Sequence, residues 1–167
     1  MATFKAPGLE KYVMQLSELE TNTDKDIGAA VYEMARVVAT EVKIRIHSLP
    51  SVSDAEGLAA YQKKGKAPIT KAEKWGLFRS FGIAPMRNDC GFLNVKLGFD
   101  GYNEIVSKKY PMGQPNAMIA RSIESGSSFR DKHPFIAPAV RAARDKAINA
   151  GAVKLDEKIH SIVDKYE

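Results

Sequence analysis

The stretch from Ser125 to Pro138 constrains the fold more than any other part of the chain, because it forces first a turn and then a helix start. The cluster 125–128, Ser-Gly-Ser-Ser, continues neither a helix nor a strand at low cost, since glycine loses the most backbone freedom on folding and serine hydroxyls compete for backbone groups. Pro138 has the fixed φ that suits a first helical turn. We therefore predict a hinge between two halves, followed by a final helix from about Pro138 toward Tyr166.

Two large apolar residues, Phe135 and Ile136, lie between Pro134 and Pro138 and follow the polar run 130–133. We expect them to hold the start of the final helix against the core; the alternative is a hydrophobic staple and nothing more. Gly151 inside the helix is expected to kink it or split it in two. The apolar positions of this helix fall on or near one face: Ala139, Ala143, Ala147, Leu155, Ile159 and Ile162.

The composition favours one domain over residues 1–167. A chain of 167 residues is long enough to bury a hydrophobic core without disulfide bonds or structural metal ions. Its content of 44% hydrophobic and 27% charged residues is that of a folded protein and not of a disordered one. No apolar run approaches the roughly 20 residues needed to cross a bilayer, so we expect no membrane partner. Cys90 is the one cysteine, which excludes an internal disulfide and agrees with a reducing cytoplasm; we expect a buried or inert thiol.

The N-terminal half predicts two helices and a loop. A short amphipathic helix covers Leu9 to Leu19, and a second begins at Thr23, where Thr23 and Asp26 have capping-box spacing, and runs to about Ser48. The segment from Pro50 to Thr70 has several breakers and no sustained period, which indicates a long surface loop.

The middle of the chain predicts a short helix over 71–81 and then a β-hairpin. Residues 81–86 and 92–99 have strand-like content, and Asn88, Asp89 and Gly91 supply a turn between them. Asn116 is the expected cap of a helix over 116–125. The fold class that follows is α+β, with a small antiparallel sheet packed against two long helices.

The order of these features resembles the tail-component proteins of long-tailed double-stranded DNA phages, whose members complete the tail and join it to the head. Four places carry the resemblance, and the last is the most specific: Gly8-Leu9; a long helix ending near Pro50; Gly76-Leu77-x-x-Ser80; and Glu124-x-Gly126-Ser127 followed by Pro134-Phe135-Ile136-x-Pro138-Ala139. Two segments depart from the family pattern. The family usually has a short link in place of 50–70 and an aromatic-rich strand in place of 116–125, which makes a strand there an equal alternative to the helix.

The resemblance implies a structural virion protein that forms a ring, expected to be a hexamer, at the neck or at the head-proximal end of the tail tube. The expected partners are other copies of the chain, the tail tube protein and a head-closure or connector protein, with DNA passing through the ring after assembly in the host cytoplasm. Repeated head-to-tail contacts close into a ring only if the rotation closes. We expect the contacts in the 50–70 loop and in the bend 124–133, at Lys63, Lys64, Lys66, Glu124, Arg130, Lys132 and Phe135.

Two other classes of function were weighed against this one. For an enzyme the sequence offers little: His47, His133 and His160 lie far apart without a ligand partner, and neither a phosphate loop nor a nucleophile elbow is present. We therefore predict no catalytic, metal or cofactor site. A nucleic-acid-binding protein is the alternative, because residues 41–87 contain nine basic and four acidic residues and so account for the whole net charge of +5.

Overall fold

The computed structural model describes residues 9–106 and 108–166, which form five α-helices and four short strands. The elements are α1 (Leu9–Ser48), α2 (Asp54–Lys64), α3 (Lys71–Ser80), β1 (Phe81–Ile83), β2 (Arg87–Asp89), β3 (Phe92–Asn94), β4 (Leu97–Phe99), α4 (Asn116–Ser125) and α5 (Ile136–Asp164). The predicted α+β class, with two long helices and a small set of antiparallel strands, is confirmed. Gly8, where the family resemblance begins, lies outside the described residues.

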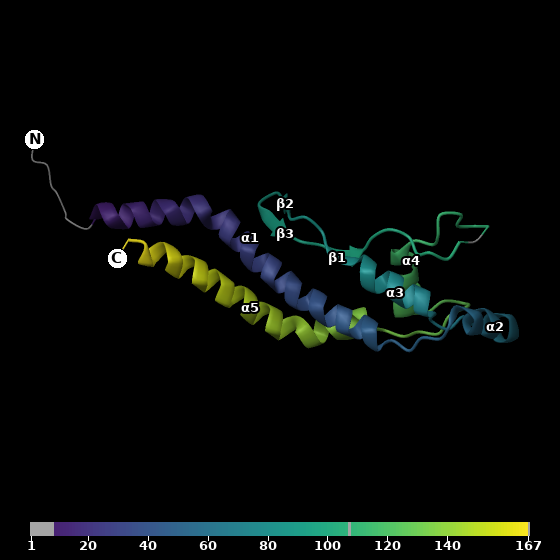
Figure 1. Ribbon diagram of the computed structural model, residues 1–167. Helices are drawn as coiled ribbons and strands as arrows, with labels where there is room; N and C mark the ends of the chain where they lie inside the picture. The colour runs from purple at the N-terminus through teal and green to yellow at the C-terminus, as the bar shows by residue number, and fades with distance from the viewer. Residues whose placement is uncertain (1–8, 107, 167) are drawn as a thin grey trace, which may run out of the picture.

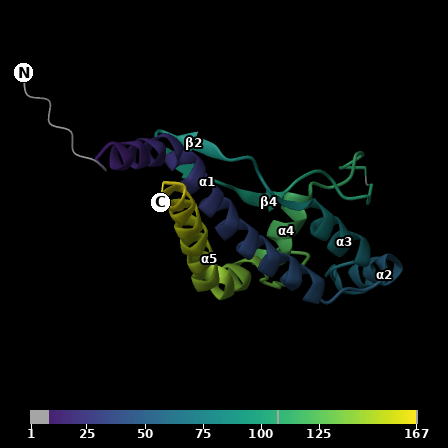
Figure 2. The ribbon, with the colours of Figure 1, turned by 60° about the vertical axis from the view of Figure 1, so that its left-hand side comes forward.

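Helices α1 and α5 run antiparallel and form an elongated arm, while α2, α3 and α4 gather at one end of it, here called the compact end (Figure 1, and Figure 2 from a second side). The antiparallel pairing is fixed at the far tip of the arm. There the Gln15 side chain donates to the Val163 carbonyl over 3.4 Å, and Lys165 Nζ donates to the Glu18 carboxylate over 2.8 Å. The start of α1 and the end of α5 therefore lie together, away from the compact end.

Helix α1 is one continuous helix of 40 residues, so the prediction of two helices with a cap at Thr23 is wrong. The Thr23 hydroxyl does not cap a new helix; it donates to the carbonyl of Leu19 over 2.6 Å. Thr21 and Asn22 make the same bond to carbonyls four residues earlier. Side chains bonded in this way often bend a helix, and Figure 1 shows that the purple N-terminal part of α1 changes direction.

Small residues on α5 allow it to approach α1 closely. Ala139, Ala143, Ala147 and Gly151 recur at every fourth position and are all buried. A Cβ atom on Gly151 would lie 2.5 Å from Cγ of Met34 on α1, so only glycine fits there without a shift. Gly151 therefore marks a tight helix contact inside one continuous helix, and the predicted split at this position is wrong.

The predicted long loop over 50–70 is also wrong, because α2 occupies its middle. Ser53 and Glu56 form a reciprocal capping box at the start of α2, and Gly65 ends it in the left-handed conformation with φ 64°. The two ends of segment 50–70 are joined by a hydrogen bond, because the Val52 N–H donates to the Ile69 carbonyl over 3.0 Å. The segment is thus an anchored helix that projects from the compact end.

The predicted hairpin is confirmed, although it is interrupted, and the prediction that Asn88 and Asp89 form its turn is wrong because both belong to β2. Its outer part pairs β2 with β3, its inner part pairs β1 with β4, and Pro85 lies in the unpaired stretch between the two parts. Cys90 and Gly91 occupy the tip with φ 54° and 90°. Cys90 is exposed there, so of the two expected cases, a buried or an inert thiol, the buried one is wrong. The β2–β3 end of the hairpin reaches α1, where the Met86 N–H donates to the Tyr32 hydroxyl over 2.9 Å.

Residues 116–125 form a helix, as predicted, and not the alternative strand. The predicted cap at Asn116 is wrong, because α4 has no side-chain cap and the Asn116 amide donates instead to the Asp100 carbonyl over 2.9 Å. The core lies where α1, α3, α4 and the start of α5 meet. Its largest fully buried side chains are Phe135, Ile46, Leu77, Ile119, Ile123 and Val42. Phe135 therefore holds the start of α5 against the core, as predicted, while Ile136 is partly buried beside it.

Candidate functional site

A buried ion pair joins the hinge before α5 to the start of α3. The Arg130 guanidinium lies 2.7 Å from the Glu73 carboxylate, and the two side chains are only 5% and 8% exposed. Glu73 has a second task, because its other carboxylate oxygen accepts from the Thr70 N–H over 3.0 Å and completes a capping box on α3. One carboxylate thus fixes both the first turn of α3 and the position of the hinge.

The Glu124 carboxylate fixes the other side of the hinge by capping α5. It accepts the N–H groups of Phe135, Ile136 and Ala137 at 2.7, 2.8 and 2.9 Å, three donors that have no partner within the helix itself. Burial by itself would raise the pKa of Glu124, but the three N–H donors and the nearby Lys132 together hold that pKa below its ordinary value. The Glu124 carboxylate is therefore ionised at neutral pH.

The structure assigns different positions to the residues that the sequence predicted as contacts. Arg130 and Phe135 are buried within the subunit and cannot present their side chains to a neighbour. Lys63, Lys64 and Lys132 are exposed, while Lys66 is half-exposed and pairs with Asp131 over 2.9 Å. Lys64, Lys66 and Arg130 do come together around one hollow of about 220 Å³ at the compact end.

An aromatic–cation patch, which the sequence analysis did not single out, lies on α3 and the adjoining part of α1. It consists of Lys43, Trp75, Phe78 and Arg79. The Trp75 and Phe78 rings stack with centroids 5.7 Å apart and planes 6° apart. Lys43 lies over Phe78 and Arg79 lies over Trp75, at 5.5 and 5.8 Å from the ring centroids. Trp75 is nevertheless 56% exposed, so the patch is ordered in the subunit yet open to a partner.

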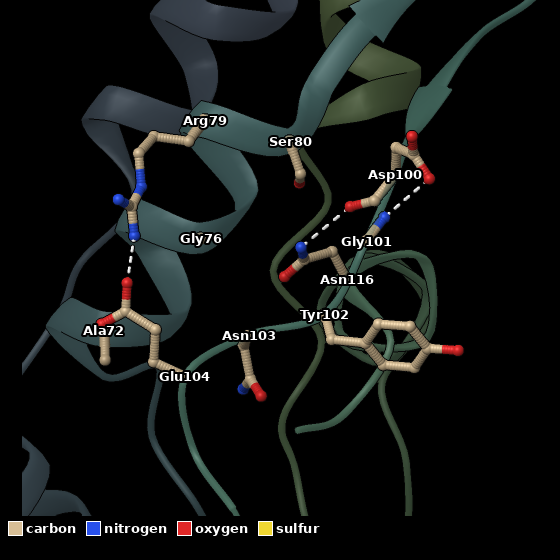
Figure 3. A pocket seen from close by; sticks show the side chains of 10 residues that line it. All are labelled: Ala72, Gly76, Arg79, Ser80, Asp100, Gly101, Tyr102, Asn103, Glu104 and Asn116. Carbon is tan, nitrogen blue, oxygen red and sulfur yellow. Dashed lines mark hydrogen bonds and ion pairs between the residues drawn. The ribbon is translucent and has the colours of Figure 1, made fainter. Parts of the chain in front are cut away.

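A second hollow, of about 320 Å³, lies between α3 and the chain that leads into α4. Figure 3 shows Arg79 paired with Glu104 on one side of it, and Asn116 bonded to Asp100 on the other. Among the described residues, the buried Oδ1 atom of Asn116 has no hydrogen-bond partner. The Ser80 hydroxyl donates to the Leu77 carbonyl over 3.4 Å, and Asn103 Oδ1 accepts from the Gln114 N–H over 2.8 Å, so both side chains hold the local backbone. We therefore assign it no chemistry.

The N-terminal part of α1 has an outer face that turns away from α5. At about 100° per residue, Val13, Glu20 and Asp24 fall within about 40° of the direction opposite Gln15, which contacts α5, and Leu16 lies beside them on the flank, about 100° from Gln15. All four are exposed, and Leu16 is 66% exposed. With the neighbouring Tyr12, they form a surface that is both apolar and acidic, here called the outer face of the arm.

The basic residues of segment 41–87 do not form one continuous surface. They are distributed over the end of α1, over α2 and α3, and over β2. Four of the nine have an ion-pair or hydrogen-bond partner within the subunit: Arg45 with Glu41, Lys66 with Asp131, Lys74 with the Leu49 carbonyl, and Arg79 with Glu104. The charge excess that motivated the nucleic-acid alternative is thus divided among several local arrangements.

Within residues 9–106 and 108–166, no group of three or more histidine, cysteine, aspartate and glutamate side chains is placed to hold a metal ion. A search of the same residues finds no helix with the length and apolar character to cross a membrane. Comparison with known proteins gave no matching family model, no matching curated protein and no matching solved structure.

Proposed function

We propose that this protein is a structural component of a phage virion, which completes the tail and joins it to the head as a ring at the neck or at the head-proximal end of the tail tube. The observation that carries the proposal is that the arm exposes apolar side chains near the start of α1, which no other part of the described subunit covers. Tyr12, Val13 and Leu16 are each more than half exposed, and Leu16 follows the other two by four and three residues, which makes the three side chains neighbours on the surface of α1. Contiguous exposed apolar surface of this kind indicates a protein contact.

The hinge supports the same proposal. It contains the sequence motif from Glu124 to Ala139 that carries the family resemblance, and this motif fixes the start of α5 to the compact end. Glu124 caps α5 and Phe135 anchors its start, so the arm is held firmly to the compact end. A ring built by repeated contacts needs such a fixed angle between the two contacting surfaces of a subunit, because a variable angle would not close. Figure 1 shows that the arm extends away from the compact end, so a contact surface on the arm and one at the compact end are far apart. In the proposed ring the further partners are the tail tube protein and a head-closure or connector protein.

The mass of the purified protein in solution tests the proposal, measured by light scattering coupled to size exclusion over a concentration series. We expect a closed ring, or a concentration-dependent step toward one, and ring-shaped particles of matching subunit number in electron micrographs. A strict monomer at every concentration would refute ring formation by the free protein. DNA binding would then be measured next, as a function of salt concentration.

A further inference from the structure

We infer that subunits associate head to tail, with the outer face of the arm of one copy seated on the aromatic–cation patch of the next. This inference rests on the proposed function, because it names the surfaces through which the proposed ring closes. It commits to one occupant for the patch, which is a second copy of this chain.

Charge complementarity is the first argument. Between Leu9 and Ile27 the chain has five acidic and two basic residues. Helix α3, which carries most of the patch, has three basic residues and one acidic residue, Glu73, which is buried and paired with Arg130. Glu18 is already held by Lys165 and Tyr166, but Glu20 and Asp24 are exposed on the outer face and bond to no described residue. The net charges of the two surfaces are therefore opposite, which favours encounter and fixes orientation.

The chemistry of the two surfaces is the second argument. Trp75 and Arg79 belong to the residue types that contribute most to protein interfaces, and their stack is already ordered in the free subunit, so little side-chain entropy is lost on binding. The outer face offers what such a patch needs: Leu16 and Tyr12 as apolar contacts for the indole ring, and carboxylates for the flanking cations.

The separation of the surfaces decides that two copies are involved. Lys43 and Leu16 are both on α1, roughly 40 Å apart at 1.5 Å per residue, so the arm of a subunit cannot reach its own patch. Because the contact joins two different surfaces, it is heterologous. Repetition of such a contact produces a closed ring if the rotation closes.

Complementary variants test the inference. The patch variant is Trp75→Ala with Arg79→Glu, and the arm variant is Leu16→Ala with Glu20→Gln. A control on α2 matched to the patch variant, Tyr61→Ala with Lys64→Glu, also replaces an aromatic ring and reverses a positive charge, at exposed positions outside both surfaces. Circular dichroism checks that all three keep their helices. We expect the patch variant and the arm variant each to associate about 30-fold more weakly than the wild type, while the control associates normally.

Mixing the two variants gives the sharpest result. The patch variant keeps an intact arm and the arm variant keeps an intact patch, so the mixture should form one-to-one dimers and nothing larger. A patch variant that assembles like the wild type would overturn the inference and leave the ring in place through other surfaces. A wild-type protein that stays monomeric at every concentration would overturn the inference and would also refute ring formation by the free protein. Binding of a single-stranded oligonucleotide that is lost in the patch variant, with self-association unchanged, would assign the patch to nucleic acid and would also overturn the inference.

Discussion

Replacement of Arg130 by methionine should destabilise the protein more than any exposed charge substitution. The variant keeps part of the apolar stem of Arg130 but leaves the Glu73 carboxylate in a site that is 8% exposed, without its cation. Removing one partner of a buried ion pair typically costs about 3–5 kcal/mol, mainly because the remaining charge is uncompensated. Since the stability of a domain is roughly 5–15 kcal/mol, the loss would be a large share of the free energy of unfolding.

Urea unfolding followed by far-UV circular dichroism measures this loss, at a protein concentration where wild type and variant have the same mass in solution. The matching thermal shift is about 6–20 °C, from roughly 2–4 °C per kcal/mol for a chain of this size. Lys66→Met is the control, because the Lys66–Asp131 pair has similar geometry but is 47% and 72% exposed. We expect this control to lose no more than about 1 kcal/mol.

The double variant Glu73→Gln with Arg130→Met separates the ion pair from simple packing. If an uncompensated charge causes the loss, the double variant should be more stable than the sum of the two single effects predicts, by about 1 kcal/mol or more. A loss for Arg130→Met as small as that of the Lys66 control, or strict additivity of the two single variants, would refute the reasoning.

Three further predictions concern the hinge, the hairpin tip and one loop glycine. Glu124→Gln should lower the free energy of unfolding by about 1.5–3 kcal/mol near neutral pH. The folded-state pKa of Glu124 lies below its ordinary value of 4.5, so the carboxylate stabilises the fold fully above pH 4.5 and loses this effect as the pH falls through the folded-state pKa. Urea unfolding curves of wild type and variant should therefore converge in acid, and a gap that stays constant with pH would contradict the cap. Cys90→Asn should raise the unfolding midpoint by stabilising the hairpin by about 0.5–1 kcal/mol, since asparagine tolerates the left-handed conformation; an unchanged or lower midpoint would be evidence against strain at the tip. Gly113→Ala should cost about 1–3 kcal/mol in the same assay, because φ is 88° and the new Cβ would overlap the Asn103 carbonyl oxygen, whereas Gly82→Ala, with open space around it, should change little.

The sequence predicted those elements whose signal lies in a repeating apolar pattern or in a forced turn. The final helix, the helix over 116–125 and the hairpin are of this kind. Helix α2 was missed because only Gly57 among its residues is buried, so a helix exposed on all sides shows no apolar stripe. The sequence does contain local signals for both ends of α2. Ser53 and Glu56 have the spacing of a capping box at its start, and Gly65 is a typical helix-ending residue.

The ion pair at the hinge shows where the sequence stops being informative. The spacing of Thr70 and Glu73 is sufficient to predict a capping box on α3. The partner of Glu73 is Arg130, which lies 57 residues further along the chain, and only the packing of the compact end brings them together. Arg130 was for that reason assigned to a contact surface, as charged residues in a polar bend usually are exposed. The patch around Trp75 was missed in the same way, since Lys43 joins it from another helix.

The pairing of the first helix with the last one determines when the protein can fold during its synthesis. Helix α1 packs along α5, which is synthesised after it; Ala30 and Met34 of α1, for example, lie beside Gly151 of α5. At about 5–20 residues per second, roughly 5–25 s pass between the synthesis of the end of α1 and that of the end of α5. Throughout this interval α1 lacks its partner helix, so the nascent chain exposes an apolar stripe that chaperones can bind, and the arm is completed only after the hinge has been made.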